Sequence, residues 1–222
     1  YEDIWIDAYT AGLTSRNTKS PTPVTIANTK DIFRLHILPM FGKYTLNYLN
    51  QNKAFVLKIM TQKAAEYANF KILRSYVNSI FDWAEELEYI ERNKLEKSLK
   101  RINATKKNQL QEAKKEEDLY LSFEQLQEWL TAVQNDYESG QLTLQDYVLF
   151  LTTFFLSDRK SETYAIKWKN VNFTTSQITI GKALDKFGNE KSTKGNKTTI
   201  FHIPNELKQL LQQWKVQQKE EL

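Results

Sequence analysis

The 222-residue sequence contains no cysteine and only two histidines. Without cysteine the chain has no disulfide framework, no thiolate nucleophile and no cysteine-based metal site, so a reducing cytoplasm is the expected compartment. Long apolar runs are also missing, because the longest, Tyr147–Leu156, is too short to cross a bilayer. No signal peptide is recognisable, and because the chain begins at Tyr1 we expect its original start to be missing. These absences predict a cytoplasmic protein without a membrane partner.

The residues that are present favour packed cores and an anionic partner. Apolar residues make up 41% of the chain and aromatic residues 13%, which is typical of one large or two small folded domains. The net charge of +4 is compatible with a polyanion but does not require one. Two stretches in or beside expected loops concentrate the charge, which favours phosphate contact. They contain Lys94, Lys97, Lys100, Arg101, Lys106 and Lys107, and Lys182, Lys186, Lys191, Lys194 and Lys197.

The first hundred residues predict a small helical bundle. Apolar residues recur at helical spacing in four segments, at about 4–9, 24–38, 55–60 and 72–84. Pro39 is expected to end the second helix, and Phe41–Gly42 to make the turn that follows. Four helices on short loops predict a four-helix bundle over residues 1–102.

The rest of the chain predicts a linker and an α+β domain. Residues 103–118 are rich in lysine and glutamate and cannot bury a core, which indicates an exposed linker. In domain 119–222, Ser122 and Gln125 form a capping-box pattern, and a helix over 142–156 follows. The periodicity then changes. Strands at 177–180 and 198–203, joined by a lysine-rich hairpin, precede a last helix from about 205. The predicted fold is mainly α with a small antiparallel β-sheet.

Arg159 is the first candidate for chemistry. The apolar helix that ends at Leu156 stops abruptly, Arg159 follows at the break, and Glu162 lies where the next helical turn begins. A guanidinium at such a junction has a fixed direction but stays partly open, which suits bidentate binding of a phosphate. A structural ion pair between Arg159 and Glu162 explains the pattern equally well.

Lys194 is the second candidate. Gly195-Asn196 is a tight-turn signal, so Lys194 is expected to project from the tip of a mobile hairpin between the two strands. There it could enter a phosphate site and deliver a proton to a leaving oxygen. An ordinary solvated lysine is the alternative, and Lys191 or Lys197 could take the same role.

In their order along the chain these features resemble the tyrosine recombinases, especially the integrases of temperate phages and of conjugative transposons of Gram-positive bacteria. In that family the first catalytic arginine stands in an Arg-x-x-Glu segment followed by a tryptophan, as in Arg159-Lys160-Ser161-Glu162 with Trp168. The catalytic lysine lies in a β-hairpin, as in Lys194-Gly195-Asn196-Lys197. The bundle is similar to the family's SAM-like core-binding domain. The resemblance covers essentially the whole chain and implies a core-binding domain followed by the first half of a catalytic domain.

The resemblance also implies a mechanism. The parent protein would cut and rejoin DNA through a 3′-phosphotyrosyl intermediate, with neither metal nor cofactor. Arg159 would stabilise the charge that develops on the phosphate, Lys194 would act as general acid, and Glu162 would orient neighbouring groups or do nothing. The family's His-x-x-Arg motif and nucleophilic tyrosine have no counterpart here, because the last tyrosine is Tyr164 and no arginine follows Arg159. We therefore expect this chain to bind DNA without cutting it.

The implied partner is double-stranded DNA at a core-type recombination site. In the family, four protomers assemble on the DNA, and an accessory directionality factor is a further possible partner. The second and fourth helices of the bundle face DNA there, although each residue is as well explained as a solvated position. The expected DNA contacts are Lys30, Arg34, Lys71, Arg74 and Asn78, with Lys191 and Lys197 in the hairpin. A non-catalytic DNA-binding module and a helical protein-interaction domain remain alternatives.

Overall fold

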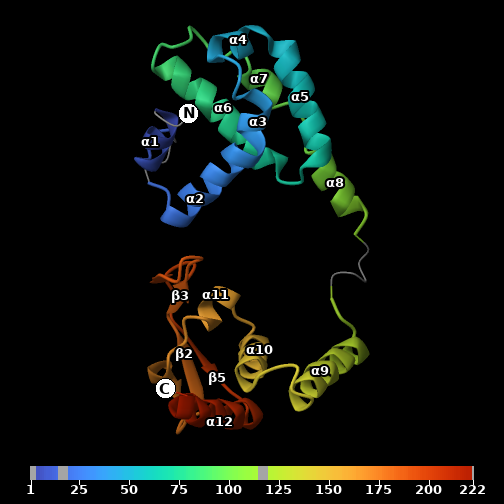
Figure 1. Ribbon diagram of the computed structural model, residues 1–222, viewed down its shortest axis with the longest axis vertical. Helices are drawn as coiled ribbons and strands as arrows, with labels where there is room; N and C mark the ends of the chain where they lie inside the picture. Colours follow the sequence, from blue (N-terminus) through green and yellow to red (C-terminus); the bar gives the residue numbers. More distant parts are fainter. Residues whose placement is uncertain (1–3, 15–19, 115–119, 222) are drawn as a thin grey trace. The chain divides into compact units, whose positions relative to one another are not determined.

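The computed structural model describes residues 4–14, 20–114 and 120–221 and consists of two compact units, Tyr1–Leu119 and Tyr120–Leu222 (Figure 1). The predicted limits of the linker, 103 and 118, remain predictions. Within that stretch, however, residues 105–112 form a helix, which their composition did not indicate. Among the described residues, no helix is both long and apolar enough to cross a membrane.

The N-terminal unit is entirely helical in its described part and has its own core. Its helices are α1 (Trp5–Thr10), α2 (Pro23–Ile32), a π-helical turn (Phe33–Ile37), α3 (Leu38–Phe41), α4 (Leu46–Gln51), α5 (Lys53–Glu66), α6 (Phe70–Glu86), α7 (Glu96–Leu99) and α8 (Thr105–Glu112). Fully buried side chains from four of these segments or their borders pack together. They are Phe33, Val56, Met60, Phe70, Leu73, Leu95 and Leu99. The four predicted helices are present, and the structure adds short helices between and after them.

The prediction that the second helix ends at Pro39 is wrong, because helical backbone continues to Phe41. A proline inside a helix lacks an N–H group and crowds the carbonyl four residues earlier. The π-helical turn accommodates it: the Leu38 N–H donates to the Phe33 carbonyl, five residues back, which widens the helix ahead of Pro39. The helix ends instead at Phe41 and is followed by Gly42, where a Cβ would lie 2.7 Å from the Leu38 oxygen.

A buried hydroxyl cluster fixes how α2 crosses α6. Thr29 is fully buried, and its Oγ1 lies 2.8 Å from the Tyr76 hydroxyl and 3.2 Å from that of Tyr9. Burial raises the pKa of Tyr76 to about 12, so its hydroxyl keeps its proton at neutral pH. Because Thr29 faces inward, the next residue, Lys30, lies on the exposed side of α2.

The C-terminal unit combines helices with a three-stranded antiparallel sheet. Its elements are α9 (Phe123–Glu138), α10 (Leu144–Leu156), α11 (Lys160–Thr163), a 3-10 turn (Trp168–Asn170), β1 (Val171–Asn172), β2 (Gln177–Ile180), β3 (Lys182–Leu184), β4 (Glu190–Ser192), β5 (Thr199–His202) and α12 (Asn205–Glu221). The strand order is β1-β2-β5. The core lies between the sheet, α10 and α12. It includes Val148, Leu151, Ile178, Ile203, Leu207 and Leu211.

The predicted capping box and the predicted pair of strands are confirmed. The Gln125 N–H donates to Ser122 Oγ at 3.2 Å, and the Ser122 N–H donates to Gln125 Oε1 at 2.8 Å. Strands β2 and β5 pair antiparallel with Ile178 opposite Phe201. The start of the α+β unit and its central pair of strands therefore follow local signals that the sequence carries.

The expected single hairpin between these strands is wrong. A second, two-stranded sheet, β3–β4, comes between β2 and β5 in the chain, and its tip is residues 185–189. In space β2 and β5 are direct neighbours, and β3 lies beyond one end of them (Figure 1). Asp185 holds that tip, because its Oδ1 accepts from the N–H groups of Phe187 at 2.8 Å and Asn189 at 2.9 Å. Lys194 therefore lies in a second turn, between β4 and β5, rather than at the hairpin tip.

Candidate nucleic-acid interface

The break in helical backbone between α10 and α11 sets the direction of the Arg159 side chain. Helix α10 ends at Leu156, the Ser157 that follows has left-handed backbone with a φ of 49°, and Arg159 has extended backbone in front of α11. The Arg159 N–H donates to Glu162 Oε2 at 3.2 Å, and Arg159 Nη1 donates to Glu162 Oε1 at 3.0 Å. One carboxylate thus holds both the backbone and the guanidinium of Arg159.

The two members of this pair differ in exposure. The Glu162 side chain is 10% exposed, whereas the Arg159 side chain is 61% exposed. A buried carboxylate with a charged partner is fixed in place, and a planar guanidinium can bind one carboxylate and still offer donors to another oxyanion. Arg159 therefore forms the structural ion pair with Glu162 and also keeps an exposed guanidinium. The two roles that the sequence left as alternatives occur together.

Asp158 turns away from Arg159 and joins α11 to α10. Its Oδ1 accepts from the Thr163 hydroxyl at 2.7 Å, and Thr163 lies 3.2 Å from the Thr153 hydroxyl of α10. Within the part of the chain that the structure describes, no ion pair joins Asp158 to Arg159. Burial raises the pKa of Asp158, and the nearby Glu162 charge adds to this effect. Asp158 therefore does not neutralise the candidate phosphate-binding arginine.

The raised pKa of Asp158 predicts that the Asp158→Asn substitution increases the stability of the fold, by an amount that depends on pH. A carboxyl with a raised pKa in the folded state binds its proton more tightly there, so the ionised form costs stability, and the cost is complete above the folded pKa. The asparagine variant should be more stable at pH 7, by less than about 1 kcal/mol because solvent screens this partly exposed group. The gain should shrink as the pH falls toward 4. Thermal melts across this range measure it, and a gain that grows on acidification would contradict the assignment.

The candidate lysines all lie on the exposed surface of the C-terminal unit. Lys191 is on β4, and Lys194 and Lys197 belong to the turn that ends at β5. That turn is closed by the Asn196 N–H, which donates to the Thr193 carbonyl at 2.9 Å, and it uses left-handed backbone at Gly195 and Asn196. The tight turn predicted at Gly195-Asn196 is therefore present. It connects β4 to β5 and is not the tip of a hairpin between β2 and β5.

Lys182 was named in the sequence only as part of the second basic stretch and was not among the candidate site residues. It lines a cavity of about 190 Å³ together with Glu162, Ala165 and Thr198, between α11 and the start of β3. Lys194 is not among the residues that line this cavity. The sequence signals for Lys182 were its place in that basic stretch and its position two residues after the strand residue Ile180. Twenty positions of chain separate it from Glu162, so only the packing of β3 against α11 brings the two together.

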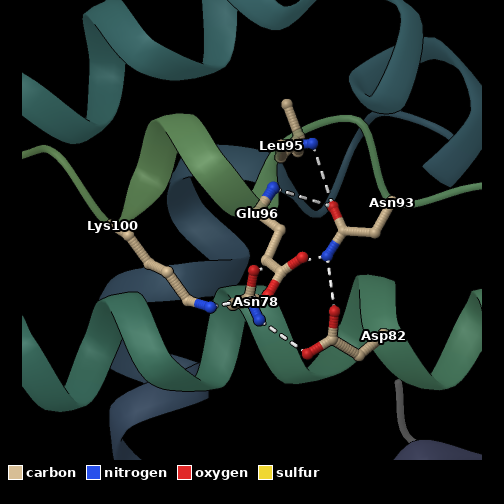
Figure 2. A network of polar contacts seen from close by, with 6 residues as sticks. All are labelled: Asn78, Asp82, Asn93, Leu95, Glu96 and Lys100. Atoms are coloured by element: carbon tan, nitrogen blue, oxygen red, sulfur yellow. Dashed lines mark hydrogen bonds and ion pairs between the residues drawn. The ribbon is translucent and has the colours of Figure 1, made fainter.

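The five candidates of the N-terminal unit divide into two groups. Lys30, Arg34 and Lys71 are exposed, and Arg34 forms an exposed ion pair with Asp31 at 3.0 Å. Arg74 and Asn78 instead contact the segment around α7. Arg74 Nη1 donates to the carbonyl of Ile102 at 2.7 Å. Asn78 Oδ1 accepts from Asn93 Nδ2 at 3.3 Å (Figure 2).

The sequence matches no protein-family model and no curated protein. Two solved structures of the Tn1549 transposon integrase, spanning its residues 82–397, do match in three dimensions. One is an arginine-to-lysine variant in complex with a circular intermediate DNA, with a TM-score of 0.63 and 14% identity. The other is a tyrosine-to-phenylalanine variant in complex with transposon right end DNA, with a TM-score of 0.63 and 13% identity.

The chain has the fold of this integrase. Each match covers 94% of this chain and 64% of the integrase chain, so the protein spans just under two thirds of the solved integrase. The match runs through both the helical unit and the α+β unit. The predicted fold class, a helical bundle followed by part of an α+β integrase domain, is therefore confirmed.

Proposed function

We propose that this protein is the DNA-binding part of a tyrosine-type site-specific recombinase and that it binds double-stranded DNA at a recombination site. One observation carries the proposal: within an integrase fold, an arginine that is 61% exposed is held at the α10–α11 break by a buried glutamate. This arrangement presents a fixed cation to an oxyanion at low entropic cost, which is what phosphoryl transfer needs.

The residues take the following roles in the proposal. Arg159 binds the scissile phosphate and stabilises the charge that develops on its non-bridging oxygens. Glu162 positions Arg159, and Lys194 protonates the departing 5′-oxygen, with Lys191 and Lys197 as alternatives for that proton. The attacking tyrosine is not among these residues in our proposal, since no tyrosine follows Tyr164. The chain alone would bind DNA without cutting it.

The remaining parts of the proposal concern partners. Lys30, Arg34 and Lys71 would contact phosphates and position the N-terminal unit on the duplex without reading sequence. Assembly of four protomers on DNA, an accessory directionality factor and a cytoplasmic location are also proposals, which rest on the resemblance to integrases.

Salt dependence of duplex binding tests the proposal. Fluorescence anisotropy with a labelled DNA duplex, between about 50 and 200 mM salt, should show affinity that falls by orders of magnitude, because each neutralised phosphate releases counterions. Replacing Arg159 by glutamine should lower the log–log slope by about 1. The matched control is Lys219→Gln, which removes an exposed charge from α12 and should leave the slope unchanged.

Three outcomes separate the competing functions. Absence of duplex affinity would contradict the proposal and favour a helical protein-interaction domain. Binding that is steeply salt-dependent but indifferent to Arg159 would favour a DNA-binding module without a catalytic arginine. A slope lowered by about 1 in the Arg159 variant, with the Lys219 control unchanged, supports the phosphate contact at Arg159 that the recombinase site requires. A DNA-binding module in which Arg159 merely holds a phosphate would give the same result.

A further inference from the structure

The polar face of α6 holds one particular segment of the chain. Arg74, Asn78, Asp82 and Glu85 are spaced four, four and three residues apart, so they lie on one face of this helix. All four contact residues 93–102, here called the α7 segment. Because α7 itself has only four residues, it cannot be stable without such external contacts.

Asn93 fastens the beginning of the α7 segment (Figure 2). Its Oδ1 accepts from the N–H groups of Leu95 at 2.9 Å and Glu96 at 3.2 Å, while its Nδ2 donates to Asp82 Oδ1 at 2.6 Å. Its own N–H donates to Glu85 Oε2 at 2.6 Å. One buried amide therefore satisfies the first donors of α7 and ties them to α6.

Arg74 fastens the other end of the α7 segment. Its Nη1 lies 3.5, 3.2 and 2.7 Å from the carbonyl oxygens of Leu99, Lys100 and Ile102. A cation at the carbonyls that follow the end of a helix is a favourable C-terminal cap. Arg74 and Asn78, which the sequence placed among direct DNA contacts, thus act on protein backbone and on other side chains.

The segment that they fix carries exposed positive charge. Residues 93–102 contain four lysines and arginines and a single acid, Glu96. Lys100 pairs with that acid at 2.6 Å, and Lys94 donates to Gln51. Lys97 and Arg101 are exposed, and among the described residues no ion pair involves either of them. These two cations are therefore available to an external anion.

The position of this charge continues the proposed DNA contacts of the unit. Arg74 places residues 99–102 beside α6, and Lys71 lies one turn before Arg74 on the same helix. A row of exposed cations on rigid backbone suits the regular negative charge of a DNA backbone. An acidic peptide would supply no such fixed spacing.

We infer that the α7 segment is a DNA-backbone contact element in which Lys97 and Arg101 bind phosphates, while Arg74 and Asn93 are positioning residues that hold it. The inference rests on the proposed DNA-binding function. It moves the phosphate contacts of this face from the middle of α6 to the neighbouring α7 segment.

The test uses the full chain and the double variant Lys97→Gln/Arg101→Gln. Anisotropy with a labelled duplex should show a log–log salt slope reduced by about 2 and an affinity about tenfold or more weaker near 0.1 M salt. The melting temperature should not change, because neither side chain pairs within the described part of the protein. The control Lys53→Gln/Lys58→Gln removes equal charge from exposed positions of α5 and should keep the wild-type slope.

Arg74 distinguishes positioning from direct contact. Arg74→Met should lower both the melting temperature and the DNA affinity, and Arg74→Lys, which restores a donor to the carbonyls, should recover part of both. Loss of affinity at an unchanged melting temperature would mean that Arg74 touches DNA itself, and would overturn its assignment.

The failure of this inference is distinct from that of the proposed function. If the wild-type chain shows no duplex affinity, the proposed function fails. If the wild type binds and the Lys97/Arg101 double variant binds with the same slope, or the α5 control loses as much, only the α7 inference fails.

Discussion

Replacing Asn93 by alanine should lower the free energy of unfolding of the N-terminal unit by about 3 kcal/mol, because partners of a buried hydrogen-bonding group lose their contacts at once. Asn93 is 7% exposed, and its side chain serves the N–H groups of Leu95 and Glu96 and the carboxylate of Asp82. Without it, the Leu95 N–H has no acceptor beside a fully buried side chain. Thermal and urea melts followed by circular dichroism measure the change.

A matched control separates this effect from the general cost of removing an asparagine. Asn108 is exposed on α8, and Asn108→Ala should change the free energy of unfolding by less than about 0.5 kcal/mol. For a unit of this size, a loss of about 3 kcal/mol corresponds to more than about 10 °C in melting temperature. Equal melting temperatures for the two variants would show that the Asn93 network contributes nothing.

Replacing Glu162 by alanine should have the largest effect in the C-terminal unit. The substitution removes the acceptor of the Arg159 N–H and the partner of its guanidinium, and leaves space at a residue that is 8% exposed. We expect the free energy of unfolding to fall by about 2 kcal/mol, as for the loss of a helix cap together with a partly buried ion pair. DNA affinity should fall to that of the Arg159→Gln variant, because the arginine is no longer aimed.

The Glu162→Gln variant separates the contribution of the hydrogen bond to the Arg159 N–H from that of the negative charge. Glu162→Gln keeps an oxygen that can accept from the Arg159 N–H, so its stability should lie within about 1 kcal/mol of the wild type. Urea melts and duplex anisotropy on the same samples give both readouts. Tighter DNA binding by Glu162→Ala than by the wild type would contradict positioning, since it would mean that the carboxylate competes with phosphate for Arg159.

The elements that the sequence predicted well are those that depend on neighbours along the chain. The helix over α6, the capping box at Ser122 and the strand at 177–180 follow from local periodicity and from side chains that bond to backbone three residues away. The pairing of Arg159 with Glu162 belongs to the same class, because three residues separate the two across the start of α11.

The elements that were predicted wrongly depend on compensation that no local rule describes. Pro39 was expected to end a helix, but a π-helical turn before it removes the conflict. The segment between β2 and β5 was expected to be one hairpin, but β3 and β4 pair with each other, and the tip is set by bonds to Asp185. In both cases the proline or turn residues were recognised in the sequence. The backbone hydrogen bonds that decide the outcome, those of the π-helical turn and of the β3–β4 pair, were not visible there.

By itself the sequence determined the succession of a helical unit and an α+β unit, the junction at Arg159 and the positions of the basic stretches, because helix periodicity, capping and charge are local properties. Only the tertiary structure decided which polar side chains bond to other parts of the protein and which stay exposed to solvent. Arg74 and Asn78 looked like solvent-facing positions on α6, yet residues 93–102 fold back onto them. Lys182 and Glu162 meet at one cavity for the same reason: packing brings distant segments together.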